Sequence, residues 1–124
     1  MASYGQPNNI INRKAAADYS ASTNLYLCMK PSSDTEVTKG GAGDLCVGFL
    51  NNLPESGQVA EINGLGGSSL AKAGGSVSVG NLVMCDANGA VVVATSGNFT
   101  VGIALQDAVS GDLFEVMPMM MQLN

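Results

Sequence analysis

The apolar residues of this chain fall into short runs that glycine-rich turns separate. In the C-terminal half the runs are "NLVMC" (81–85), "AVVVAT" (90–95), "FTVGIALQ" (99–106) and "LFEVMPM" (113–119). The first two are joined by "DANG" (86–89), which contains Asn-Gly, a strong hairpin signal. The pattern predicts short strands throughout, with helical turns only around 13–19 and 68–73, and therefore an all-β fold.

Two of the runs, Leu82–Met84 and Val91–Val93, are apolar at consecutive positions. Such strands are typically covered on both faces. One small sheet covers one face, so we expect a second subunit on the other. The methionine-rich end (117–123) suits the same contact because methionine adapts to interfaces, although plain core packing is the alternative. The predicted subunit-interface residues are Val83, Val92, Met117, Met119, Met120 and Met121.

The chain contains a weak internal repeat. The segment "VGFLNNLPESGQVAEI" (47–62) aligns without a gap with "VGIALQDAVSGDLFEV" (101–116), 54 positions later. An Asn-Leu-x-x-Cys pattern recurs with a slightly different offset, ending at Cys28 and at Cys85. We therefore expect two similar β-units, at about 24–66 and 81–121, in which these two cysteines are equivalent.

The three cysteines, Cys28, Cys46 and Cys85, admit three interpretations: packing, a metal site or a disulfide. Packing is favoured, because free cysteine is among the most buried residue types. A metal site is disfavoured by the absence of histidine and of CxxC spacing. A disulfide is disfavoured by a reducing compartment. The prediction is no metal and no cofactor.

Residues 1–22 lie outside both repeats, so the predicted domain layout is an extended N-terminal arm (1–22) followed by a β-domain (23–124). Gly5, Pro7 and two asparagines discourage regular structure there. The arm nevertheless has apolar residues that would gain from burial and one adjacent pair of positive charges. We expect it to bind a larger surface, with an ordinary ragged terminus as the alternative. Its predicted binding residues are Tyr4, Ile10, Ile11, Arg13, Lys14 and Tyr19.

Charge and chemistry exclude several classes. Only 12% of residues are charged and the net charge is −5, which disfavours nucleic-acid binding. No apolar run approaches the roughly 18 residues of a membrane span, and no signal peptide is apparent. Without histidine the usual nucleophilic triad cannot be built. Glu61 and Glu115 fall at matched repeat positions, which favours a structural role over acid–base catalysis. The sequence therefore predicts no enzyme and no small-molecule substrate.

Residues 74–118 resemble the capsid cement, or head-decoration, proteins of tailed phages. The similar elements are a small-residue run into Val77–Val83, a turn rich in Asp, Asn and Gly, a valine-rich strand, Val101–Ala104, and Ser110-Gly111-Asp112 through Val116. A weaker earlier copy is seen at Val47–Leu50 and Ile62–Leu65, with Gly66 where an aromatic residue is usual.

The resemblance implies a small β-barrel or β-tulip-like domain that forms a homotrimer. It implies a virion protein that binds the major capsid protein on the exterior of an icosahedral head, after assembly in the host cytoplasm. Its role would be mechanical, stabilising capsomer joints against the pressure of the packaged DNA. The alternatives are a tail-tube, fibre or baseplate β-subunit, and a small-ligand-binding β-barrel. The last would need a polar pocket that the sequence does not indicate.

Overall fold

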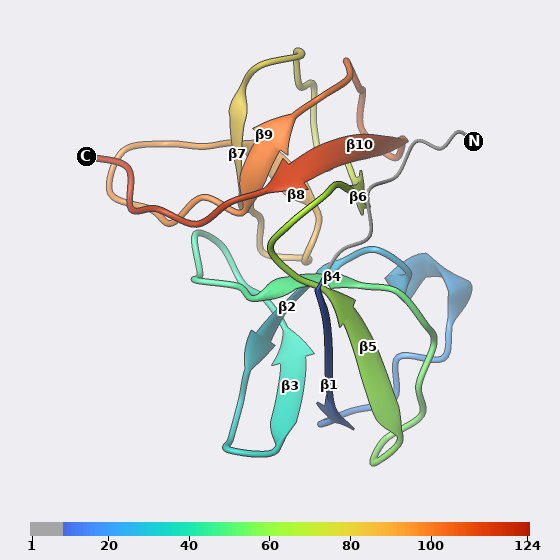
Figure 1. Cartoon of the computed structure of the whole chain (residues 1–124). Coiled ribbons are helices and arrows are strands. Elements are labelled where there is room, and N and C mark those ends of the chain that lie inside the picture. The colour runs from blue at the N-terminus through green and yellow to red at the C-terminus, as the bar shows by residue number, and fades with distance from the viewer. Residues whose placement is uncertain (1–8) are drawn as a thin grey trace.

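The computed structural model describes residues 9–124, and their regular secondary structure is almost entirely β-strand (Figure 1). One short 3-10 helix is present, η1 (Ser22–Asn24). The strands are β1 (Ile10–Ala15), β2 (Cys28–Pro31), β3 (Glu36–Lys39), β4 (Gly48–Leu50), β5 (Val59–Asn63), β6 (Ser69–Lys72), β7 (Leu82–Cys85), β8 (Val91–Val93), β9 (Gly102–Ala104) and β10 (Leu113–Pro118). The predicted all-β class is confirmed. No helix among the described residues is long and apolar enough to span a membrane.

The first unit is a closed barrel with the strand order β1-β3-β2-β4-β5. Strand β1 closes it, because it pairs antiparallel with β5 from Ile10 to Lys14 and parallel with β3 at Lys14 and Ala15. Ala15 is fully buried and Ile11 packs against the barrel core. The predicted arm is therefore wrong from residue 10 onward, as is the helical turn at 13–19: this segment supplies a strand that the barrel needs.

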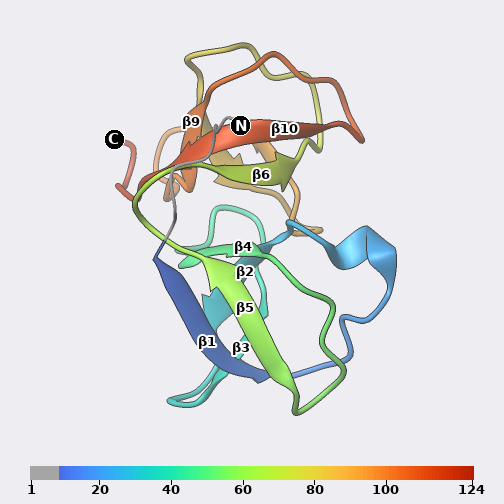
Figure 2. The ribbon, with the colours of Figure 1, turned by 45° about the vertical axis from the view of Figure 1, so that its right-hand side comes forward.

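The second unit is a five-stranded sheet with the order β6-β10-β9-β7-β8. Its outer strands approach each other through a single parallel bridge between Ala73 and Val91. The predicted helical turn at 68–73 is wrong, since Ser69–Lys72 pairs with β10 as strand β6. Figures 1 and 2 show this unit above the barrel, which is coloured blue to green.

The two units have the same strand order and matching registers. In the barrel, β4 pairs with β5 through Phe49 and Asn63. In the second unit, β9 pairs with β10 through Ile103 and Met117, each 54 positions later. Strands β2 to β5 correspond to β7 to β10, and β1 corresponds to β6. The duplication predicted from the sequence is thus present in the pairing pattern.

The register corrects one detail of that prediction. Cys28 pairs with Phe49, whereas the equivalent pair in the second unit is Leu82 with Ile103. Cys28 and Cys85 are therefore not equivalent positions. The offset of the cysteine pattern differs from the true structural offset of 54, so the shared Asn-Leu-x-x-Cys letters do not reflect a shared place in the fold.

Two hydrophobic cores hold the molecule together. One lies inside the barrel and includes Met29, Leu50 and Ile62. The other fills the second unit, where alternating residues of β10, such as Phe114 and Val116, point inward. The second core also contains three side chains from the first unit, namely Cys28, Cys46 and Phe49. The two units consequently share a core.

Candidate functional site

The outer side of β10 is an exposed apolar surface. Leu113 and Met117 are 52% and 41% exposed, and Leu70, on the neighbouring strand β6, is 38% exposed. These three side chains lie on one side of the sheet, because Leu70 pairs with Glu115, which stands between Leu113 and Met117. We call this surface the β10 face. Ser68 Oγ donates a hydrogen bond of 2.6 Å to Glu115 Oε2 at its centre, which gives this carboxylate a local structural partner.

The matching surface of the first unit is more polar. Val59 occupies the place of Leu113, and Glu61 that of Glu115. Their partners on β1 are Lys14 and Asn12, both exposed. The duplicated scaffold thus presents one apolar and one polar version of the same strand surface. Exposed apolar surface is more typical of a contact with another protein.

The predicted interface residues are distributed unevenly. Met117 belongs to the β10 face, Met120 and Met121 are exposed near the C-terminus, and Val92 and Met119 are half-buried. Val83 is wrong as an interface residue, because it is fully buried in the second core. Burial alternates along β7, whereas along β8 it falls from buried Val91 to exposed Val93, so each strand places part of its apolar run in the second core.

The predicted arm residues are also separated by the structure. Tyr4 lies outside the described residues. Ile10 is 48% exposed, and Arg13 and Lys14 are exposed on β1. The other two face inward: Ile11 is half-buried at the barrel core and Tyr19 is buried within it.

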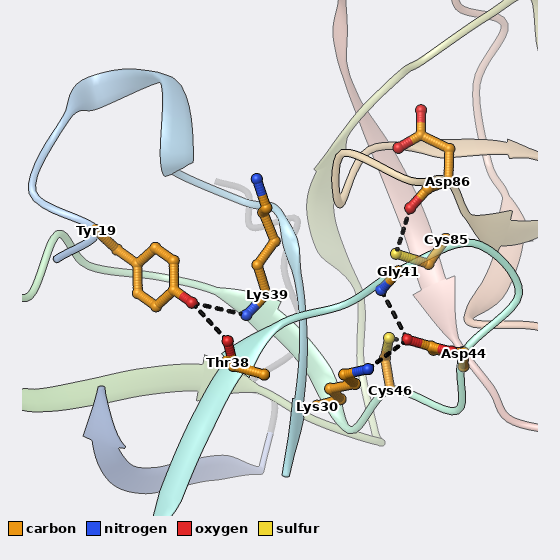
Figure 3. A network of polar contacts seen from close by, with 9 residues as sticks. All are labelled: Tyr19, Lys30, Thr38, Lys39, Gly41, Asp44, Cys46, Cys85 and Asp86. Atoms are coloured by element: carbon orange, nitrogen blue, oxygen red, sulfur yellow. Dashed lines mark hydrogen bonds and ion pairs between the residues drawn. The ribbon is translucent and has the colours of Figure 1, made fainter. Parts of the chain in front are cut away.

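Tyr19 has a defined structural role. Its hydroxyl lies 2.8 Å from Thr38 Oγ1 and accepts a hydrogen bond of 2.9 Å from the backbone N–H of Lys39 (Figure 3). It therefore ties the segment after β1 to strand β3. This tyrosine is unavailable as a surface contact.

The three cysteines converge where the two units meet. Their Sγ atoms all lie within 4.8 Å of one another, and each residue is at most 1% exposed. Cys28 begins β2, Cys46 precedes β4 and Cys85 ends β7. Sequence reasoning missed this cluster because the spacing of 18 and 39 residues between successive cysteines matches no compact ligand motif.

Polar groups surround the sulfur atoms. Cys46 Sγ donates to the carbonyl oxygen of Asp44 at 3.6 Å, and Cys85 Sγ donates to that of Asp86 at 3.2 Å. The Asp44 carboxylate accepts bonds from Lys30 Nζ at 2.6 Å and from the Gly41 N–H at 2.8 Å (Figure 3). These two bonds lower the pKa of Asp44, and the same carboxylate raises the pKa of Lys30.

The three thiols influence one another's ionisation. Hydrogen bonds from Cys28 and Cys85 lower the pKa of Cys46. The pKa of Cys28 is raised, first by its bonds to Cys46 and Cys85 and then by burial. For Cys85, the hydrogen bond with Cys28 lowers the pKa. The hydrogen bond with Cys46 and the burial of the thiol raise it by more, so the net pKa of Cys85 is raised.

Comparisons with known proteins find one matching family and a similar solved structure. A model of the family described as phage cement protein matches residues 19–118. Among solved structures, the chain is similar to the crystal structure of the head fiber gp8.5 N base in bacteriophage phi29. The TM-score is 0.68 at 17% identity, over 90% of this chain and 93% of that one. Comparison with curated proteins gives no match. At this identity the structural likeness establishes the fold alone.

Proposed function

The chain belongs to the phage cement protein family, and we propose that it binds the outside of an icosahedral phage head and stabilises the joints between capsomers. The family makes it a structural protein of the virion. The observation that carries the proposal is the family match over residues 19–118. In this role the chain needs no catalysis, cofactor, nucleic acid or membrane.

The active form is a homotrimer in which the β10 face is the subunit contact. Support comes from the contrast between the two units. Leu113 and Met117 are exposed on β10, whereas Val59, at the place of Leu113 in the first unit, pairs with the charged residue Lys14. The low content of charged residues, 12%, also favours covered surface in an assembly. Met120 and Met121, which follow β10 in the chain, are also exposed.

The capsid contact is made by the exposed side chains of β1. Arg13 and Lys14 are exposed there, and they are the only adjacent positive charges in an acidic chain. Ile10 is 48% exposed on the same strand and can be buried against the major capsid protein. Charged residues such as Arg13 and Lys14 mainly control the rate and specificity of docking. Burial of the apolar residue Ile10 contributes to affinity.

The test uses purified protein and phage heads that lack it. We expect about three chains per particle by light scattering, and binding to heads by co-sedimentation. Leu113→Glu should dissociate the trimer, whereas Val59→Glu, at the matched position, should leave it intact. Arg13→Glu with Lys14→Glu should keep the trimer and abolish head binding. A stable wild-type monomer at micromolar concentration contradicts the trimer, and wild-type binding by the double variant contradicts the contact at β1. Rings or filaments would instead favour a tail component.

A further inference from the structure

We propose that Cys28, Cys46 and Cys85 together bind one soft, thiophilic metal ion of the Cu(I) type. The inference is independent of head binding and departs from the packing role that the sequence favours. Its basis is the convergence of three sulfur atoms from distant parts of the chain into one buried cluster. Thiolates are the preferred ligands of such ions.

The spacing of the sulfur atoms suits a shared ion. Three sulfur atoms each about 2.3 Å from one metal ion lie roughly 4 Å from one another. The three Sγ atoms here are all within 4.8 Å of one another, so small side-chain rotations bring them to that distance. The side chains approach from β2, from the segment before β4 and from β7, which surrounds the ion on three sides.

Gly40 keeps space open beside the cluster. A Cβ atom at this position would lie 2.6 Å from Cys46 Sγ and 2.9 Å from Cys85 Sγ, well inside normal contact. The backbone of Gly40 is itself fixed, because its N–H donates to the carbonyl oxygen of Cys28 at 2.9 Å. A side chain here would push against two of the three proposed ligands, which explains why glycine suits this position.

The ligand set favours a soft ion in three-coordination. The sequence has no histidine and no fourth cysteine. Closed structural zinc sites use four protein ligands, and open ones add a water to three. The three cysteines are at most 1% exposed, so a site they form has little access to water. Two neighbouring carboxylates already have partners: that of Asp44 is bound to Lys30 and Gly41, and that of Asp86 accepts bonds from the N–H groups of Asn88 and Ala90. Three thiolates alone match Cu(I) better than Zn(II).

An ion at this position would connect the two units. Cys28 and Cys46 belong to the first unit and Cys85 to the second. A ligand that binds only the folded chain also raises its melting temperature, by an amount that grows with the logarithm of the ratio of ligand concentration to Kd. Copper binding should therefore be visible both as stoichiometry and as thermal stabilisation.

The experiment titrates reduced, metal-free full-length protein with Cu(I) under anaerobic conditions, with Zn(II) and Mg(II) in parallel. We expect one copper per chain after gel filtration, a higher melting temperature, and protection of all three thiols from alkylation. Mg(II) should do none of this, and Zn(II) should bind more weakly than Cu(I). Cys85→Ala should lose at least 100-fold in copper affinity while its cooperative melting shows that it is folded.

Gly40→Ala should weaken copper binding similarly, and Gly75→Ala is its control because a Cβ there meets Val92 only at 3.7 Å. Should either variant fail to fold, alkylation protection of the wild-type thiols by Cu(I) decides the question. The proposal is overturned if the wild-type protein binds no copper or gains no thiol protection. It is equally overturned if folded Cys85→Ala retains wild-type affinity, or if the cluster forms a disulfide in preference to taking up metal.

Discussion

Replacing Phe49 by alanine should destabilise both units at once. Phe49 is on β4 of the first unit, is fully buried, and packs in the core of the second unit. Truncation of a buried phenylalanine costs about 3–5 kcal/mol, through lost transfer energy and the cavity left behind. A whole domain is stable by only about 5–15 kcal/mol, so the loss is about a fifth or more of the total.

The assay is urea denaturation followed by far-ultraviolet circular dichroism and tyrosine fluorescence at a fixed protein concentration. Phe49→Ala should shift one common transition in both probes, because the core it leaves is shared by the two units. Leu53→Ala is the reference: Leu53 is 38% exposed and lies outside both core clusters, so its cost should stay within about 0.5–1 kcal/mol. A cost below about 1 kcal/mol for Phe49→Ala, or two separate transitions in the wild-type protein, would refute the shared core.

Three further predictions concern packing and closure. Gly102→Ala should lower the free energy of unfolding by about 1–3 kcal/mol in a denaturant titration, because its Cβ would overlap Val116 Cγ1 and lie 2.7 Å from the Met117 carbonyl oxygen. Gly75→Ala is the control, and an equal loss in both variants would contradict this account. Tyr19→Phe should cost about 1–3 kcal/mol, since the N–H of Lys39 loses its acceptor, and a change as small as that of Tyr26→Phe would argue against it. Deleting residues 2–14 should lower the melting temperature strongly by removing most of β1 from the barrel; an unchanged value would show that β1 is dispensable.

The sequence was informative where local patterns decide structure. Asn-Gly at 88–89 marks the hairpin between β7 and β8, and the aligned segments 47–62 and 101–116 reproduce the true offset of 54 between the units. The family resemblance is carried by residues 74–118 and by the weaker copy at Val47–Leu50 and Ile62–Leu65, and the family match covers all of them. These features depend on neighbours in the chain or on repetition, both of which a sequence displays directly.

What the sequence did not disclose depends on contacts between distant residues. Strand β1 carries exposed residues at Asn12 to Lys14, so it lacks the regular alternation that would identify it, and its partners β3 and β5 follow much later in the chain. The cysteine cluster is similar, because only the folded chain brings Cys85 to Cys28. Val83 is mistaken for an interface residue because an unbroken apolar run, Leu82–Met84, does not show which side chain faces the core.

The two units close differently, and this sets where the molecule opens first. Strands β1 and β3 are joined by two residue pairs. The corresponding contact between the ends of β6 and β8 is one residue pair, the bridge between Ala73 and Val91. Local opening begins where the fewest backbone hydrogen bonds must break. In native-state hydrogen exchange, amides along this second contact should therefore exchange sooner than those of β7 and β9, so the second unit is the part of the protein that can loosen without the whole chain unfolding.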